Sequence, residues 1–174
     1  MEKLKNSPEK ICGFYVSDWH LVTMILPYIY KELNEKANIV TILEKDIEKN
    51  IKTLISKLNL KNEKKVLKLN WKASKEKNIN EILNKNYNIN ENNNILFISG
   101  SKTYIDVINN DILCWLKNNK IESKNLKIIN CYEVTEFNNN IVEILNSHNK
   151  VLNTSGERYI YEVFDGYSEA QEMC

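Results

Sequence analysis

The segment Ser99-Gly100-Ser101-Lys102 has the residue types of a small binding turn. It directly follows the apolar run Ile95–Ile98, so a buried strand is expected to end there and a helix to begin at Ser101. Backbone N–H groups exposed at such a helix start can hold an anion or a carbonyl oxygen. The same residues also suit an ordinary tight turn capped by a serine, and this is the interpretation we favour. A nucleophile elbow is excluded, because Gly-x-Ser-x-Gly is absent.

Histidine and cysteine, which often hold metals or act in catalysis, are few and scattered. His20 lies close to Asp18 behind the first predicted strand, where it can form a polar site or serve a helix end. His148 is expected at the end of a helix, where its partial positive charge suits the helix dipole. The four cysteines are Cys12, Cys114, Cys131 and Cys174. Without an H-x-x-x-H or C-x-x-C spacing, we expect neither a metal site nor a cofactor, and we interpret the cysteines as reduced thiols.

Five aromatic side chains lie near predicted strand ends, where they can line a site for a small apolar or amphipathic ligand. They are Tyr15, Trp19, Trp71, Tyr104 and Tyr132. Core or rim packing is the competing interpretation for each of them. With the polar residues around them they form the candidate ligand-binding set: Tyr15, Ser17, Asp18, Trp19, His20, Trp71, Ser99, Gly100, Ser101, Tyr104 and Tyr132.

Short β-branched runs alternate with amphipathic stretches, and these elements must position the candidate side chains. Strands are predicted at Ile11–Val16, Asn38–Leu43, Lys65–Leu69, Ile95–Ser99, Leu126–Tyr132 and Lys150–Asn153, with a partly exposed edge strand at Tyr159–Phe164. Helices are predicted at Asp18–Leu33, Asp46–Leu58, Ile79–Leu83, Ser101–Leu116 and Glu136–Ser147. Asp18 and Asp46 are the predicted N-caps, and Pro27 is expected to bend or break the first helix.

The alternation of strands and helices predicts an α/β domain with a mostly parallel central sheet and helices on both faces. In such a sheet, ligands bind outside the carboxyl ends of the strands. The candidate residues are therefore expected along one rim of the domain.

Length and charge restrict the function classes. The 174 residues suit one domain, which we place at residues 10–164, between a flexible N-terminus at 1–9 and a tail at 165–174. The 24 basic and 23 acidic residues give a net charge of +1, and Arg158 is the single arginine, so nucleic-acid binding is not expected. The longest apolar run, Leu21–Tyr30, falls far short of the roughly 20 residues of a membrane span. The polar N-terminus does not suit a signal peptide, so we expect a cytoplasmic protein without membrane contact.

Two stretches resemble a known family of sensory domains. The first is Ile11-Cys12-Gly13-Phe14-Tyr15-Val16-Ser17-Asp18, followed by Leu26-Pro27-Tyr28. The second is Ile129-Asn130-Cys131-Tyr132-Glu133-Val134, followed by Phe137 and by Ile144-Leu145-Asn146-Ser147-His148. In order and spacing they are similar to the MEDS sensory domain, which is named for methanogens, methylotrophs and the dichloromethane-responsive repressor. Lys10 and Glu133 depart from the family pattern, which has histidine and aspartate at these positions.

The resemblance implies a RecA-like three-layer fold derived from ATPases. The phosphate-binding loop of those ATPases would follow the first strand. The chain has no glycine between Gly13 and Gly100 and no G-x-x-x-x-G-K-[ST] motif, so this loop cannot form. ATP hydrolysis is therefore not expected.

We expect a stand-alone sensory or regulatory domain without catalysis, which binds a small organic ligand or a separate signalling protein at the strand-end rim. Output would need a homo-oligomer or a signalling partner. The helix Ser101–Asn118 and the edge strand Tyr159–Phe164 are the predicted contact surfaces. We keep two alternatives: a pure protein-interaction module that regulates a kinase or a sigma-factor-type switch, and a small enzyme acting on a nucleotide or acyl substrate.

Overall fold

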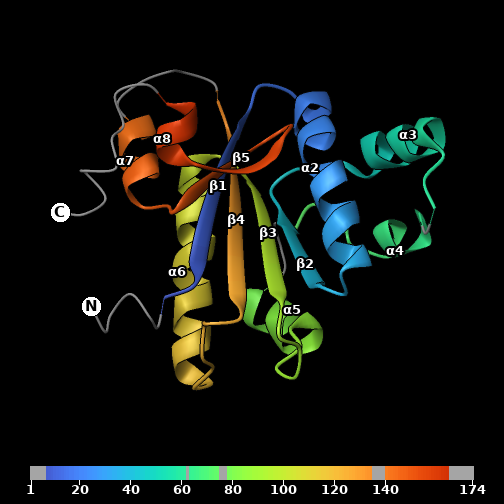
Figure 1. Cartoon of the computed structure of the whole chain (residues 1–174). Coiled ribbons are helices and arrows are strands. Elements are labelled where there is room, and N and C mark those ends of the chain that lie inside the picture. Colours follow the sequence, from blue (N-terminus) through green and yellow to red (C-terminus); the bar gives the residue numbers. More distant parts are fainter. Residues whose placement is uncertain (1–6, 62, 75–77, 135–139, 165–174) are drawn as a thin grey trace.

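The computed structural model describes residues 7–61, 63–74, 78–134 and 140–164. Within these residues, a six-stranded sheet runs in the order β2-β3-β4-β1-β5-β6 (Figure 1). The strands are β1 (Glu9–Tyr15), β2 (Asn38–Leu43), β3 (Asn94–Gly100), β4 (Leu126–Glu133), β5 (Lys150–Asn153) and β6 (Gly156–Tyr159). The strands β1 to β5 pair in parallel, whereas β6 pairs antiparallel with β5. The predicted α/β class with a mostly parallel sheet is confirmed.

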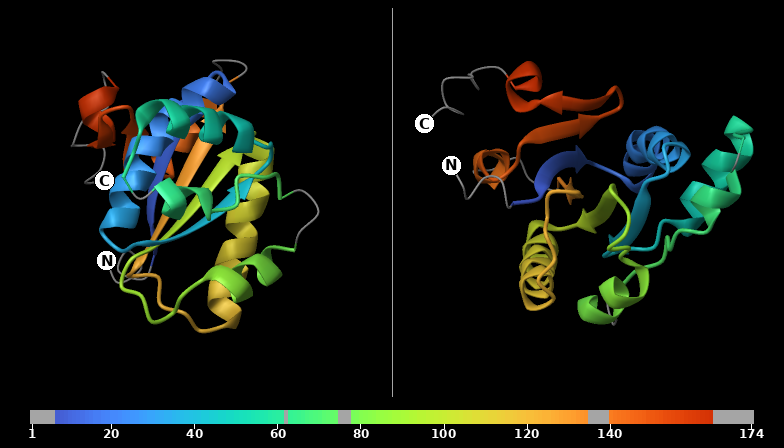
Figure 2. Two further views of the ribbon diagram at one scale, coloured as in Figure 1. Left: turned by 90° about the vertical axis from the view of Figure 1, so that its right-hand side faces the viewer. Right: turned by 60° about the horizontal axis from the view of Figure 1, so that its bottom comes forward.

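Helices pack on both faces of the sheet (Figure 2). One face carries α2 (Asp18–Asn34), α3 (Glu48–Leu58) and α4 (Glu63–Leu67). The other face carries α5 (Ile79–Asn86), α6 (Lys102–Asn118), α7 (Asn140–Asn146) and α8 (Ile160–Val163). Successive strand residues point to opposite faces, so Ile11 belongs to the core under α2 and Cys12 to the core under α6. Because both faces are covered, the strand sequences are almost continuously apolar.

The predicted strand at Lys65–Leu69 is wrong, because most of this segment belongs to the short helix α4. Val66 is fully buried but both of its neighbours are exposed, and one buried side chain is too few to hold a strand against the sheet. The carbonyl of Val66 accepts the indole N–H of Trp71 at 2.8 Å, and this hydrogen bond closes the turn that follows α4. The edge of β2 is extended instead by a single parallel bridge between Leu43 and Ala73.

The predicted edge strand at Tyr159–Phe164 is also wrong. The strand β6 ends at Tyr159, and the chain then forms α8, whose Ile160 is buried in the core under α6. The strand β6 begins at Gly156, directly after the turn from β5, and the φ of +100° at this residue suits glycine. The edge strand on this side of the sheet is therefore Gly156–Tyr159.

Neither predicted aspartate caps its helix. Ser17 caps α2, and Asp18 lies in the first turn. The helix α3 begins at Glu48, and the carboxylate of Asp46 accepts the N–H of Ala73 instead. Asp46 thus ties the loop after β2 to the bridge that extends this edge.

The other helix predictions hold with small changes. Pro27 lies inside α2 without ending the helix, and Ser101 caps α6 as predicted. Residues 136–139 of the helix predicted at 136–147 lie outside the described residues, as do residues 1–6 of the predicted flexible N-terminus and the whole predicted tail, 165–174. Within the described part of the chain, no helix has both the length and the apolar character needed to cross a membrane.

Candidate functional site

The path of the chain diverges between the neighbouring strands β1 and β4. From β1 the chain passes through α2 on one face to the distant strand β2, whereas from β4 it passes through α7 on the other face to β5. Ligands of parallel α/β sheets bind at such a divergence, outside the carboxyl ends of the strands. Here the N–H of Val134 donates to the carbonyl of Tyr15 at 2.9 Å. Lys45, which follows β2, reaches across to Glu133 at 2.9 Å. A hydrogen bond and an ion pair within the protein therefore already occupy this part of the rim, where a ligand would be expected.

Four of the predicted site residues build the start of α2. The hydroxyl of Ser17 accepts the N–H of His20 at 3.1 Å, and the imidazole Nδ1 of His20 accepts the N–H of Val16 at 3.1 Å. Asp18 lies in the first turn, where its negative charge favours the helix dipole. Trp19 is 50% exposed. Side chains of the protein thus take up backbone N–H groups that an external anion would need.

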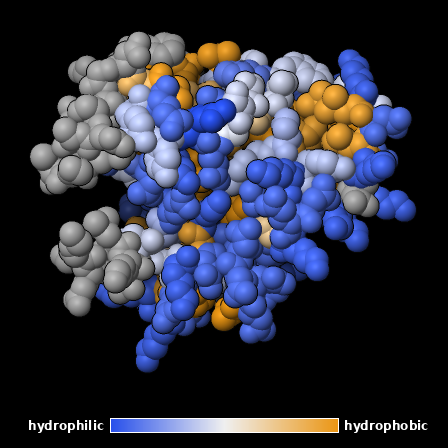
Figure 3. All heavy atoms as spheres, viewed as in Figure 1, coloured by the Kyte–Doolittle hydropathy of each residue, from blue (hydrophilic) through white to orange (hydrophobic). Residues whose placement is uncertain are grey.

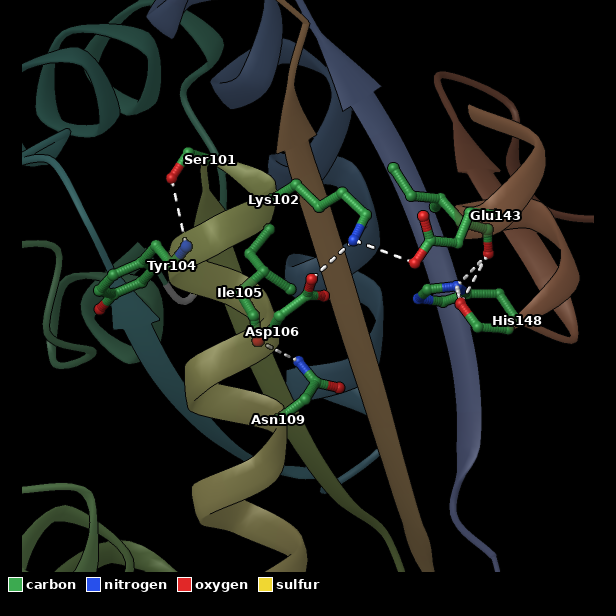
Figure 4. Close-up of polar contacts among 10 residues, drawn as sticks. Ser101, Lys102, Tyr104, Ile105, Asp106, Asn109, Glu143 and His148 are labelled. Carbon is green, nitrogen blue, oxygen red and sulfur yellow. Dashed lines mark hydrogen bonds and ion pairs between the residues drawn. The ribbon is translucent and has the colours of Figure 1, made fainter. Parts of the chain in front are cut away.

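A carboxylate of the protein occupies the predicted binding turn at the start of α6. Glu44, which follows β2, accepts the backbone N–H of Ser101 at 3.0 Å and its hydroxyl at 3.3 Å. The same hydroxyl accepts the N–H of Tyr104 (Figure 4). Ser99 is buried, and Gly100 passes so close that a Cβ there would lie 2.8 Å from the Cβ of Glu44. An anion could bind this turn only by displacing Glu44.

The predicted aromatic residues do not surround one cavity among the described residues. Tyr15 and Trp71 pack in the core under α2, whereas Tyr104 and Tyr132 pack on the opposite face of the sheet. The hydroxyl of Tyr104 is buried and has no hydrogen-bond partner in the described part of the chain. Burial, with a smaller contribution from the charge of Glu44, raises the pKa of Tyr104 to about 12. Ligand binding by this aromatic set stays a prediction.

Tyr132 does line a pocket, on the face that α6 and α7 cover. This pocket has a volume of about 290 Å³ and is called the α6–α7 pocket below. Its lining residues are Lys10, Lys102, Asp106, Asn109, Asn110, Leu113, Tyr132, Glu143, Ile144 and Ser147. They come from β1, β4, α6, α7 and the residue that follows α7, so segments distant in sequence meet here (Figure 4).

A buried polar network adjoins the α6–α7 pocket. Asn109 on α6 and Asn130 on β4 exchange two amide hydrogen bonds, of 2.9 and 3.2 Å. The amide nitrogen of Asn130 also lies 3.0 Å from Nε2 of His148, whose Nδ1 lies 2.6 Å from the carbonyl of Ile144. Because a carbonyl can only accept, Nδ1 carries the proton and Nε2 accepts from Asn130. The three side chains are 8% exposed or less, and their hydrogen bonds hold α6, β4 and the end of α7 together.

His148 is neutral at physiological pH, which corrects the prediction that positive charge is its contribution to a helix end. Burial lowers the pKa of His148 from 6.5 to about 4, and the hydrogen bond to Ile144 opposes this only in part. The imidazole still serves the helix, because its N–H satisfies a carbonyl in the last turn of α7.

Two lysines of the pocket differ in their surroundings. Lys102 on α6 lies 2.7 Å from Asp106 on the same helix and 3.4 Å from Glu143 on α7, so it links the two helices (Figure 4). Lys10 reaches the pocket from β1, and burial lowers its pKa although Asp106 attracts its charge. The pocket thus contains one doubly paired lysine and one that makes no ion pair with the described residues.

Most of this site was not predicted from the sequence. Tyr132 belongs to both the predicted set and the pocket lining, whereas Lys10, Asn109 and Asn130 are absent from the predicted set. A signal was available, since Asn109 and Asn130 each place an amide among buried apolar positions. Buried amides are normally hydrogen-bonded, so two of them on adjacent elements indicate a network.

A larger cavity of about 530 Å³ lies between α2 and the turn from β5 to β6. Its carboxylate Glu157 already accepts the hydroxyl of Tyr28 at 2.5 Å and the ammonium of Lys127 at 3.1 Å. Because these polar groups satisfy one another, the α6–α7 pocket is the better candidate site.

Metal and thiol chemistry find little support in the described residues. No three His, Cys, Asp or Glu side chains of this part of the chain form a cluster that could hold a metal ion. The thiols of Cys12 and Cys131 are buried, and burial raises both pKa values, that of Cys12 to about 12. Both are therefore poor nucleophiles at neutral pH.

Comparisons with known proteins give no match to this chain among family models, curated proteins or solved structures.

Proposed function

We propose that the chain is a non-catalytic sensory domain of the MEDS type, which binds a small organic ligand in the α6–α7 pocket. The observation that carries this proposal is the meeting of β1, β4, α6 and α7 around a pocket rich in polar side chains. Its volume of about 290 Å³ is near the lower end for ligand pockets, which begin at about 300 Å³, and suits a small metabolite.

The network of Asn109, Asn130 and His148 supports a role in recognition. Buried hydrogen-bonded groups add little net stability over apolar side chains of the same shape. Apolar side chains between α6 and β4 would therefore stabilise the fold about as well as this network does. A fixed set of amides beside a pocket holds the pocket wall in one position, and this is what selective ligand binding requires.

The chemistry of Ser147 and His148 supports the absence of catalysis. The hydroxyl of Ser147 lies 3.0 Å from Nδ1 of His148, which is the spacing of a nucleophile and its base. However, Nδ1 already carries a proton that it donates to Ile144, and Nε2 accepts from Asn130. The imidazole has no free lone pair, so it cannot take the proton of Ser147.

Lys102 can transmit ligand binding in the pocket to the surface of the protein. It links α6 to α7 through Glu143, and both partners line the pocket. A bound ligand that changes this ion pair changes how α7 rests on α6, and a partner protein or a second copy of the chain can detect that change. Binding can shift the arrangement only by the difference in affinity for the two states.

A thermal-shift screen tests the proposal. The purified protein is screened against nucleotides, small organic acids, alcohols, halides and fatty acids. A pocket ligand should raise the Tm of the wild type and lose this effect in Asn110→Trp, because the indole fills the pocket from an exposed wall position. Asp111→Trp, at an exposed position outside the lining, is the matched control and should keep the shift.

Two results would count against this function. Hits that Asn110→Trp leaves unchanged, or the absence of any hit, would contradict binding in the α6–α7 pocket. Chemical conversion of a hit during incubation with the protein, followed by mass spectrometry, would favour the alternative of a small enzyme.

Exposed apolar side chains favour a second candidate function, a protein-interaction module that regulates a kinase or a sigma-factor-type switch. Val16 and Trp19 are 64% and 50% exposed at the strand-end rim. Leu58 on α3 is 49% exposed, and Figure 3 shows apolar surface over this helix on an otherwise largely hydrophilic face. Apolar surface of this kind marks contacts with other proteins when it is contiguous. An oligomer that Trp19→Ser converts to monomers in sedimentation experiments would support this candidate.

A further inference from the structure

Lys10 is held in place at the start of the sheet. Its backbone N–H donates to the side-chain carbonyl of Asn149 at 2.8 Å, and the N–H of Asn149 donates to the carbonyl of Lys10 at 2.7 Å. These two bonds fix β1 to the residues between α7 and β5. The side chain of Lys10 is thereby directed to the α6–α7 face, where it lines the pocket.

The ammonium group of Lys10 is partly desolvated and has no hydrogen-bonded counterion among the described residues. The two carboxylates of the pocket, Asp106 and Glu143, are both within 3.4 Å of Lys102 instead. A partly buried charge without a direct partner is unfavourable, and an anion in the pocket would relieve this cost.

The rest of the lining indicates what else the anion carries. Leu113, Ile144 and the ring of Tyr132 offer apolar surface. The side-chain amide of Asn110 and the hydroxyl of Tyr132 make no hydrogen bond in the described part of the chain and are available to a polar group. A ligand with one charged end and a short carbon chain matches this arrangement.

We infer that the α6–α7 pocket binds a small monocarboxylate, whose carboxylate pairs with Lys10 and whose carbon chain packs against Leu113, Ile144 and Tyr132. This inference rests on the proposed function and names the ligand class of the same pocket. The volume of about 290 Å³ restricts the ligand to a short-chain acid, including hydroxy and keto acids.

Charge balance favours a single carboxylate over a phosphate. The two lysines and the two carboxylates of the lining cancel formally, with Lys10 the cation that lacks a direct partner. A monoanion adds one negative charge, whereas a phosphate dianion adds two beside Asp106 and Glu143. Like charges inside one small, partly buried pocket repel each other strongly. The N–H groups of His20 at the start of α2 and of Ser101 at the start of α6 already donate to Ser17 and to Glu44, respectively, so they are not available to a phosphate.

Calorimetric titration of the whole protein tests the inference with defined probes. Acetate, butyrate, lactate and 2-oxobutyrate are compared with butyramide and inorganic phosphate. At least one of the four acids should bind, and it should bind at least ten-fold more tightly than butyramide or phosphate.

The Lys10→Met variant tests whether the ammonium of Lys10 binds the carboxylate of the ligand. It removes the ammonium but keeps an unbranched side chain of similar reach, and it should fold, since it removes a partly desolvated charge. Affinity for the acid should fall at least ten-fold in Lys10→Met. It should stay unchanged in Lys49→Met, which removes an exposed charge on the opposite face of the sheet.

The outcomes separate the ligand class from the function. Equal binding of butyrate and butyramide, or unchanged affinity in Lys10→Met, overturns the monocarboxylate while the pocket remains a ligand site. The monocarboxylate is also overturned if every ligand from the broader screen whose binding depends on Asn110 is neutral or doubly charged. The absence of any ligand that depends on Asn110 overturns the proposed function as well.

Discussion

Replacement of His148 by glutamine should make the stability of the protein less dependent on pH. Burial lowers the pKa of this histidine from 6.5 to about 4. Between these values the unfolded chain binds a proton that the folded chain resists, so the free energy of unfolding falls as the pH falls. Proton linkage gives a loss of about 2 kcal/mol between pH 7 and pH 5 from this one residue. A glutamine does not titrate, and its carbonyl can still accept from Asn130.

Urea unfolding of the wild type and His148→Gln at pH 7, 6 and 5 measures this difference. The slope with respect to pH contains contributions from every carboxylate, but these cancel when the two proteins are compared. The wild type should lose about 2 kcal/mol more than the variant over this range. Parallel pH profiles of the two proteins would refute the assignment of His148 as a buried neutral histidine.

Further substitutions test the packing around the site and near it by the same unfolding measurement. Gly100→Ala should lower the free energy of unfolding by about 2 kcal/mol or more, because its Cβ would meet Glu44, whereas Gly156→Ala, with a positive φ but open space around it, should lower it by only about 1 kcal/mol. Asn109→Leu should lower it by about 1–3 kcal/mol, since it removes hydrogen bonds to a buried amide. The double change with Asn130→Leu should lower it by less than the sum of the two, and strictly additive values would contradict a shared network. Glu44→Gln should lower it by about 1 kcal/mol through the loss of negative charge at the start of α6, and an unchanged value would argue against its capping role.

The strands of the central sheet could be predicted from the sequence because burial on both faces leaves continuous apolar runs. Asn38–Leu43 and Lys150–Asn153 match the observed strands at both ends, and the run at 95–99 differs from β3 by one residue at each end. The errors fall where tertiary contacts override short patterns. Lys65–Leu69 has the composition of a strand but packs only Val66 into the core, and Tyr159–Phe164 is divided between β6 and α8.

The candidate site was harder to predict, because it depends on which elements become neighbours. The residues at the starts of α2 and α6 lie at the rim, as expected, but their hydrogen-bonding groups serve the chain itself. The lining of the α6–α7 pocket combines residues more than 130 positions apart, such as Lys10 and Glu143, and no local pattern joins them. Only the register of β1 beside β4, with Cys12 opposite Asn130, brings them to one face.

Mapping of ligand binding onto backbone amides by ¹⁵N chemical shifts tests the central claim most directly. The protein is titrated with the strongest hit of the ligand screen, and each amide is followed separately. We predict that the largest shifts cluster at Lys10, Asn110 and Ser147, around the α6–α7 pocket. Shifts centred instead on residues 16–20 at the strand-end rim, or no shift at saturating ligand, would contradict a ligand site in this pocket.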